Sequence, residues 1–201
     1  MPHPRPSAPA RPAALATDTP PVVPHRTMLP NGLEVIVLEN HGVPLVTLEI
    51  DVHNGAYTET AAYDGLSHLY EHMFFKANQR IPDQESYLKR TRELGMEWNG
   101  TTSEERVNYY FTLQSRDLAA GLGFLSDAIR TPLFLPEELA REREVVLGEY
   151  DRAEADPGFH LQVTIAKQLW HTHYTRKNVI GSREVIQTAT PEKMFAIQRM
   201  F

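Results

Sequence analysis

The sequence of 201 residues contains no cysteine, which excludes disulfide bonds, cysteine nucleophiles and zinc sites built on thiolates. It also contains no run of 18 apolar residues, so a transmembrane helix is excluded. Basic residues are in the minority, with 20 Lys and Arg against 26 Asp and Glu and a net charge of −6. This balance argues against a nucleic-acid-binding protein, which usually carries a basic surface. A metal site in this chain must therefore use carboxylates and some of the 9 histidines.

Proline is concentrated at the start of the chain. Nine of the 15 prolines lie within the first 30 residues, and Ala, Ser and Thr fill most of the gaps between them. Such a segment cannot form a packed element, so residues 1–27 are predicted to be a flexible Pro/Ala-rich leader. It lacks the uninterrupted apolar stretch of a secretory signal, and a linker is favoured over a targeting segment. Residues 28–201 are predicted to form one folded domain, because 41% of the chain is hydrophobic.

The apolar pattern after residue 27 changes between period two and period 3.6. Alternation over Val46–His53 predicts a half-buried strand. Leu118, Leu122, Leu125 and Ile129 step by four, three and four residues, which predicts one apolar helix face. The full set of expected elements is strands at 33–39, 46–53, 96–103 and 107–114, helices at 65–75, 83–94, 118–129 and 136–155, and a mostly helical remainder with a loop at 172–181. The order predicts an α/β (α+β) fold, a two-layer sandwich of a mostly antiparallel sheet packed with helices.

The most informative motif is H-x-x-E-H at His68, Glu71 and His72. On a helix, residues four apart stack on one face, so both imidazoles can bind one metal ion. Glu71 borders the same face and can reach a metal-bound water without ligating the metal. The competing interpretation is two surface histidines beside a charged residue. A second pair, His171 and His173, lacks a usefully spaced carboxylate and is interpreted as packing histidines.

A catalytic zinc site needs a third protein ligand and an open fourth position. Glu142 and Glu149 are seven residues apart on one predicted helix, so they share a face two turns apart. One of them can ligate the metal while the other supports a histidine from behind. The competing interpretation is a solvated acidic face, the usual meaning of glutamates on a surface helix.

Together these residues resemble the pitrilysin/insulinase family of zinc metallopeptidases, which includes the mitochondrial processing peptidases. In that family H-x-x-E-H is followed after about 76 residues by a ligating Glu, and 149 − 72 − 1 = 76 residues separate His72 from Glu149. Further similar segments are the opening turn at 29–33, the G-[SA]-x-x-E pattern at 55–59, the N-A-x-T pattern at 99–102, and His173-Tyr174 with Gly181. At Gly100 the chain departs from the pattern, which has Ala there.

The resemblance implies one zinc ion per domain, bound by His68, His72 and Glu149, with Glu71 as the general base. It also implies that Glu142 supports a ligand from the second shell of contacts. The substrate would lie along the strand that contains Asn99, Gly100, Thr101 and Thr102. The implied fold is the N-terminal domain of a pitrilysin or processing peptidase, incomplete at its C-terminus and without the second, similarly folded domain.

The implied activity is zinc-dependent hydrolysis of peptide bonds in extended peptides or unfolded proteins. The alternative is a truncated or non-catalytic family subunit that binds zinc and a peptide or partner without turnover. A missing C-terminal domain or a partner subunit is expected to close the cleft, and no nucleic acid or membrane span is expected. Family members work in the bacterial periplasm, the cytosol and mitochondria, and a bacterial extracytoplasmic location is favoured here.

Overall fold

The computed structural model describes residues 23–170 and 178–201. The predicted leader up to residue 22 and the pair His171 and His173 lie outside the described residues. The chain divides into two compact units, residues 1–43 and residues 44–201.

The first unit contains a β-hairpin. Strand β1 (His25–Met28) pairs antiparallel with β2 (Glu34–Val37), with His25 opposite Val37. The turn between them is closed by Gly32, whose φ of 86° suits glycine, and whose N–H donates to the carbonyl of Leu29 (2.9 Å). Strand β1 therefore begins inside the segment predicted to be leader. The physical reason is that the chain has no proline between Pro24 and Pro30, so the N–H groups of residues 25–28 can donate to β2, which lies within the strand predicted at 33–39.

The second unit is built on a three-stranded antiparallel sheet in the order β3-β5-β4. Strand β3 (Leu45–Val52) pairs along its whole length with β5 (Val107–Gln114), and β5 pairs in turn with β4 (Glu97–Thr102). The antiparallel sheet predicted from the sequence is confirmed. Strand β4 is an edge strand of this sheet, so the main chain on its outer side has no strand partner among the described residues.

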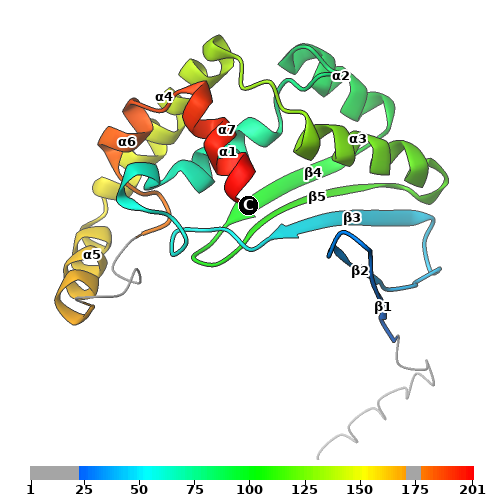
Figure 1. The fold of residues 1–201 in the computed structure, drawn as a ribbon, viewed down its shortest axis with the longest axis horizontal. Helices are drawn as coiled ribbons and strands as arrows, with labels where there is room; N and C mark the ends of the chain where they lie inside the picture. Colours follow the sequence, from blue (N-terminus) through cyan, green and yellow to red (C-terminus); the bar gives the residue numbers. More distant parts are fainter. Residues whose placement is uncertain (1–22, 171–177) are drawn as a thin grey trace, which may run out of the picture. The chain divides into compact units, whose positions relative to one another are not determined.

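Helices cover one face of this sheet, which gives the expected two layers (Figure 1). The helical elements are η1 (Ala61–Tyr63), α1 (Leu66–Phe74), α2 (Gln84–Glu93), η2 (Ser115–Asp117), α3 (Leu118–Arg130), α4 (Pro136–Glu154), α5 (Pro157–Leu169), α6 (Arg183–Gln187) and α7 (Pro191–Met200). Pro136 occupies the first turn of α4, where its missing N–H costs nothing. Pro157 does the same for α5, whose N-terminus is capped by the Asp156 carboxylate accepting from the N–H of Gly158 (2.8 Å).

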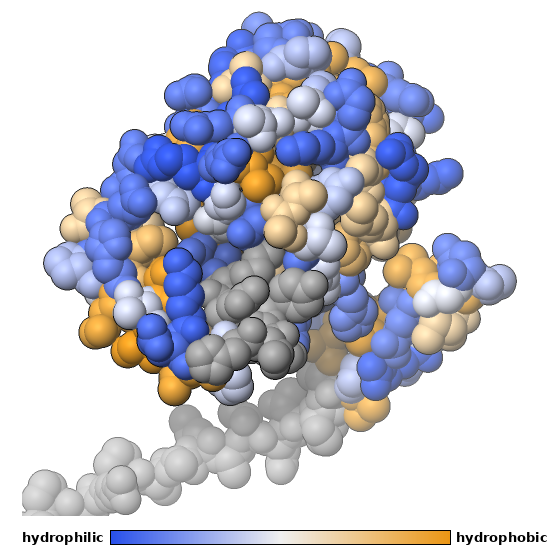
Figure 2. All heavy atoms as spheres, turned by 60° about the vertical axis from the view of Figure 1, so that its left-hand side comes forward, coloured by the Kyte–Doolittle hydropathy of each residue, from blue (hydrophilic) through white to orange (hydrophobic). Residues whose placement is uncertain are grey.

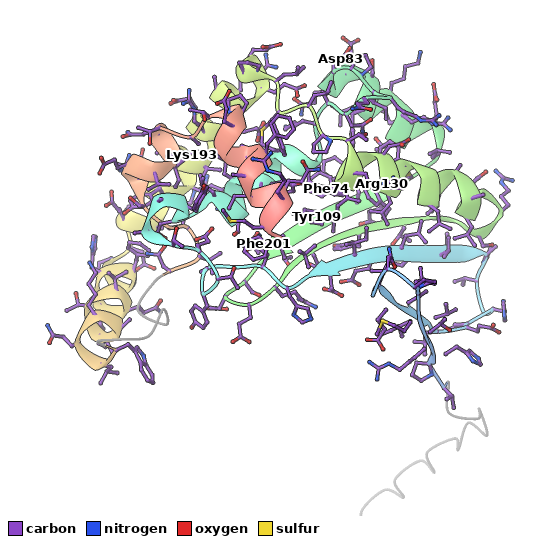
Figure 3. The ribbon with its side chains drawn as sticks, viewed as in Figure 1. Phe74, Asp83, Tyr109, Arg130, Lys193 and Phe201 are labelled. Carbon is purple, nitrogen blue, oxygen red and sulfur yellow. The ribbon has the colours of Figure 1, made fainter. Side chains whose placement is uncertain are left out.

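The hydrophobic core lies between the helix layer and the sheet. Phe74 of α1 stacks on Tyr109 of β5 with ring centroids 3.8 Å apart, and the two side chains meet between the layers (Figure 3). Phe111 follows Tyr109 on the same face of β5 and is fully buried. The aromatic contacts fix α1 on the middle of the sheet, and α1 is the helix that carries the H-x-x-E-H motif.

The helix predicted around residues 118–129 forms as α3, and its predicted apolar face is correct at Leu125 and Ile129 but wrong at Leu118 and Leu122. Leu118 and Leu122 are 40% and 50% exposed, whereas Phe124 and Leu125 are buried. The inward face is centred on Gly121, where an added Cβ would lie 2.9 Å from side-chain atoms of Leu113 and of Leu48. The absence of a side chain at Gly121 lets the helix approach the sheet closely, and that contact overrides the spacing of the leucines.

Polar residues cover much of the face drawn in Figure 2, with hydrophobic patches between them, consistent with a chain in which 23% of residues are charged. Among the described residues, no helix has both the length and the apolar character needed to cross a membrane.

Candidate metal centre

The N-terminus of α1 is held by a buried carboxylate. Glu59, which is 2% exposed, accepts hydrogen bonds from the N–H groups of Gly65 (2.9 Å) and Ser67 (2.7 Å). These are N–H groups that the helix itself leaves without partners, and a negative charge at this end is favourable. The contact explains the Glu of the G-[SA]-x-x-E pattern, because it fixes where the motif helix begins.

A second contact at the same end is between two glycines. Gly65 and Gly181 both have positive φ values, 93° and 78°. A Cβ added at Gly181 would lie 2.2 Å from the Cα of Gly65, so the two backbones approach too closely for any side chain. The N–H of Ser182 donates to the carbonyl of Asp64 (3.1 Å), which joins this loop to the start of α1. The glycine noted in the sequence at 181 therefore has a packing role.

The motif helix buries one side and presents its histidines on the other. Leu66, Leu69 and Met73 are at most 1% exposed. The side chains of His68 and His72 are each 17% exposed, and their ring centroids lie 4.9 Å apart. The two imidazoles thus lie one turn apart on the same helix face, as predicted, with their rings edge to face at 85°.

Helix α4 brings a carboxylate to both rings. Oε2 of Glu149 lies 3.5 Å from Nε2 of His68 and 3.8 Å from Nε2 of His72. One donor atom from each residue lies within 4.8 Å of the other two. Zinc bonds of about 2.0–2.2 Å in a tetrahedral arrangement separate neighbouring ligand atoms by about 3.3–3.6 Å. The His68–Glu149 separation of 3.5 Å fits this geometry, the His72–Glu149 separation of 3.8 Å is slightly longer, and the donor types are those that zinc prefers.

Glu142 approaches His72 from the opposite side of the ring. Its Oε2 lies 3.2 Å from Nδ1 of His72, and its Oε1 lies 2.6 Å from Nζ of Lys76. Burial would raise the pKa of Glu142, but the hydrogen bonds to His72 and Lys76 outweigh it and lower that pKa. The anionic form of the carboxylate is therefore favoured, and the other nitrogen of the ring, Nε2, faces Glu149.

Lys76 was missed by the sequence reasoning. Its side chain is 10% exposed, and a buried ammonium requires a partner of opposite charge. The only local signal is its position four residues after His72, which places it near the same side of the chain.

His68 has a different environment. Burial, followed by the neighbouring charge of His72, lowers the pKa of His68 to about 4, so its ring is neutral at pH 7. Its Nδ1 is buried and has no hydrogen-bond partner among the described residues. A neutral imidazole is the form that ligates metals, and Nε2 is the nitrogen that faces Glu149.

Glu71 lies against strand β4. The hydroxyl of Thr102 donates to Oε2 of Glu71 (2.6 Å). Burial raises the pKa of Glu71 and outweighs the opposing effect of this hydrogen bond. A carboxylate with a raised pKa is better suited to accept and return a proton near neutral pH than an ordinary exposed glutamate.

The four residues of the N-A-x-T-like segment all lie on β4, where successive residues face opposite sides of the sheet. Gly100 is buried, as expected for a position facing α1, and Thr102 is half-buried on the same side. Asn99 and Thr101 are exposed, and the Thr101 hydroxyl donates to the side chain of Asn108 on β5. A substrate-binding role for these four residues stays a prediction.

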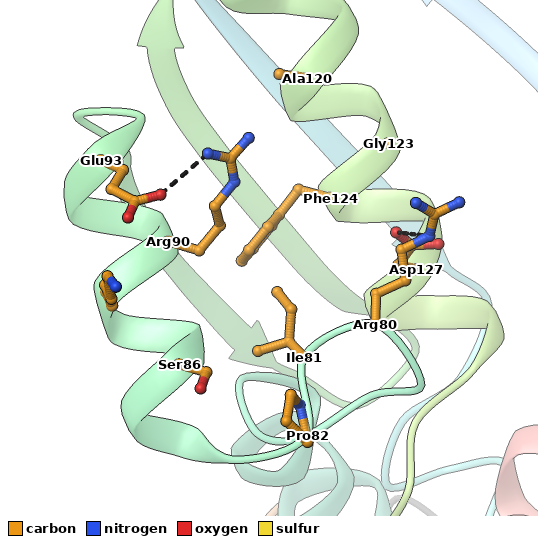
Figure 4. A pocket seen from close by; sticks show the side chains of 11 residues that line it. Arg80, Ile81, Pro82, Ser86, Arg90, Glu93, Ala120, Gly123, Phe124 and Asp127 are labelled. Carbon is orange, nitrogen blue, oxygen red and sulfur yellow. Dashed lines mark hydrogen bonds and ion pairs between the residues drawn. The ribbon is translucent and has the colours of Figure 1, made fainter.

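Two pockets lie on this unit. One of about 520 Å³ opens between α2 and α3, with Ile81 and Phe124 as apolar lining and Arg80 and Arg90 at its rim (Figure 4). It contains none of the predicted site residues. The other, of about 450 Å³, is lined by residues of α4 and α5 and by the residue between them: Glu149, Arg152, Ala153, Asp156, Phe159 and Gln162. The second pocket therefore adjoins the cluster of His68, His72 and Glu149.

Solved structures with the same fold are proteases and related domains. A protease from Helicobacter pylori superposes with a TM-score of 0.80 at 20% identity, covering 88% of this chain and 43% of that chain. A domain from Pseudomonas fluorescens described as a peptidase M16 inactive domain gives a TM-score of 0.80 at 18% identity, covering 86% and 42%. The fold of the chain is thus that of these peptidase domains.

The family follows from the sequence comparison. Residues 34–183 match the family model described as Insulinase (Peptidase family M16). The chain belongs to this peptidase family, and the resemblance stated from the motifs is confirmed.

Curated relatives are much longer than the matched region. The coenzyme PQQ synthesis protein F of Pseudomonas aeruginosa is 29% identical over 160 residues, 80% of this chain and 21% of that protein. The mitochondrial-processing peptidase subunit beta of Blastocladiella emersonii is 32% identical over 128 residues, 64% and 27%. An uncharacterized zinc protease of Rickettsia felis is 26% identical over 164 residues, 82% and 40%. The chain thus spans about a fifth to two fifths of these relatives.

Proposed function

We propose that this peptidase-family domain is a zinc-dependent endopeptidase domain that hydrolyses peptide bonds in extended peptides. The observation that carries the proposal is the convergence of His68, His72 and Glu149, whose donor atoms lie within 4.8 Å of one another. Three protein ligands, two imidazoles and one carboxylate, leave a fourth tetrahedral position for water or substrate. The name of the Rickettsia felis relative, a zinc protease, supports the choice of metal.

When bound, zinc would lower the pKa of a coordinated water to about 7 and polarise the scissile carbonyl. The residues of the chain would supply the remaining chemistry. Glu71 would accept the proton of the attacking water and pass it to the leaving amine. Glu142 would keep Nε2 of His72 pointed at the metal, because it binds the opposite nitrogen of the ring at 3.2 Å.

The substrate is proposed to lie extended along the outer edge of β4. Its main chain would pair with the backbone of Asn99–Thr102, so that binding would depend little on substrate sequence. The pocket between α4 and α5 is next to Glu149 and offers room for one substrate side chain, with Phe159 and Arg152 in its lining. A further domain or a partner subunit would close the cleft, and an extracytoplasmic location in a bacterium is proposed.

A second candidate function is binding of zinc and peptide without turnover. It is favoured by the solved structure of the same fold from Pseudomonas fluorescens, which is described as an inactive domain. Against it stands the complete set of His68, Glu71, His72 and Glu149 in this chain.

The test compares the wild type with Glu71→Gln on an unstructured fluorogenic peptide. Zinc content is measured by metal analysis of the same samples. The wild type is expected to hold one zinc and to cleave the peptide, with cleavage stopped by a chelator and restored by zinc. Glu71→Gln is expected to keep zinc and lose cleavage. A wild type that holds zinc without cleaving supports the second candidate, and full turnover in Glu71→Gln removes Glu71 as the base.

A further inference from the structure

We infer that strand β4 positions the carboxylate of Glu71, with Thr102 holding one oxygen and Gly100 leaving the space in which the side chain lies. The inference rests on the proposed function, in which Glu71 is the general base. It assigns a role to the hydroxyl of Thr102 and to the absence of a side chain at Gly100. This role is separate from the main-chain pairing with substrate.

The hydrogen bond from Thr102 is short. Its hydroxyl lies 2.6 Å from Oε2 of Glu71, the distance typical of a hydroxyl donating to a charged oxygen. Glu71 is largely buried, so if its carboxylate lost the hydrogen bond from Thr102, few water molecules could reach it to replace that bond. The bond uses Oε2 and leaves Oε1 to accept a proton.

The contact at Gly100 sets how close the Glu71 side chain comes to the strand. A Cβ added at Gly100 would lie 2.9 Å from Cγ of Glu71 and 3.2 Å from Cε2 of Phe75. Phe75 cannot easily give way, because its ring is stacked on Trp98 with centroids 4.4 Å apart. A side chain at position 100 would therefore push Glu71 away from β4.

Gly100 and Thr102 are two residues apart on one strand, so they face the same side of the sheet. Together they limit Glu71 to a narrow range of side-chain angles, one by a donor and the other by an empty space. A base held within a few tenths of an ångström avoids the rate loss of about a hundredfold that a misplacement of 1 Å can cause.

The test uses four single variants of the full chain, Thr102→Val, Thr102→Ser, Thr112→Val and Gly100→Ala. Thr102→Val keeps the shape of the side chain and removes the donor, and Thr102→Ser restores the donor. Thr112→Val is the matched control, because the Thr112 hydroxyl makes a comparable side-chain bond to Thr47 (2.9 Å) in a region away from the metal centre. Zinc affinity is measured by competition with a chelator, Glu71 is located in crystal structures, and kcat and KM are measured on the peptide.

Thr102→Val is expected to bind zinc as the wild type does, to show the Glu71 carboxylate displaced, and to lose kcat by about 10- to 100-fold with KM within about twofold. Thr102→Ser is expected to return Glu71 to its place and to regain most of the kcat that Thr102→Val loses, and Thr112→Val is expected to match the wild type. In Gly100→Ala the carboxylate is expected to move away from β4.

Glu71 remaining in place in Thr102→Val, or an unchanged kcat, would overturn the inference. A wild type without turnover overturns the proposed function instead, and the position of Glu71 in the crystal structures then still decides whether β4 holds it.

Discussion

Replacing Glu149 with Gln removes the charged donor that faces both histidines, while the fold is left almost untouched. The Glu149 side chain is 36% exposed, and its ion-pair partners among the described residues are the two imidazoles, so the change buries no new group. The matched variant is Glu142→Gln on the same helix face. Glu142 contacts Nζ of Lys76 and, on His72, only Nδ1, the nitrogen that points away from Glu149.

The expected loss of zinc affinity follows from the number of ligands. Apparent binding free energies of structural zinc sites are about 10–16 kcal/mol, so one of three protein ligands accounts for about 3–5 kcal/mol if the share is equal. This corresponds to a loss of two to nearly four powers of ten in affinity for Glu149→Gln. Glu142→Gln keeps an oxygen that can accept from Nδ1, and a loss of only about 10- to 100-fold is expected.

The assay is competition for zinc with a chromophoric chelator, with far-UV circular dichroism to show that each variant is folded. If Glu149→Gln binds zinc within tenfold of the wild type, Glu149 is not a ligand. If Glu142→Gln loses more affinity than Glu149→Gln, the two glutamates have exchanged roles and the assignment from the geometry is wrong.

Two further predictions concern the residues that hold the centre in place. Lys76→Met should lower zinc affinity by about tenfold and the free energy of unfolding by about 1–3 kcal/mol, because Oε1 of Glu142 loses its partner at 2.6 Å in a largely buried site. Chelator competition measures the affinity and urea denaturation measures the stability, with Lys89→Met at an exposed position as the control. Equal zinc affinity in the two variants would contradict the role of Lys76. Gly181→Ala should cost at least about 1–3 kcal/mol of unfolding free energy, because its Cβ would lie 2.2 Å from the Cα of Gly65 and its φ is 78°. Gly123→Ala, at a helical position where an added Cβ meets nothing within 4 Å, should be neutral or stabilising, and equal midpoints in urea for the two glycine variants would refute this account of Gly181.

The elements that carry the site could be predicted closely from the sequence. The motif helix was expected at residues 65–75 and is observed at Leu66–Phe74, and the glutamate helix was expected at 136–155 and is observed at Pro136–Glu154. Both have strong local signals, an apolar stripe in the first and a proline at the start of the second. Helix geometry then placed the two histidines together without further information.

Other parts depend on contacts that no local pattern contains. Seven-residue spacing puts Glu142 and Glu149 on one face of α4, and periodicity alone left open which of them faces the metal. The structure separates them because His72 lies between them, with Nδ1 toward Glu142 and Nε2 toward Glu149. The ion pair between Lys76 and Glu142 joins residues that are distant in sequence.

The two histidines and the glutamate of the motif helix are contacted by different parts of the fold. Helix α4 supplies Glu149 and Glu142 to the histidines, whereas strand β4 supplies Thr102 to Glu71. Variants in α4 should therefore change zinc affinity first, and variants on the inward face of β4 should change turnover without changing zinc affinity. Glu59 and Gly181 act on the N-terminus of α1 itself, so a change at either should weaken metal binding and catalysis together, because it moves all three motif residues as one body.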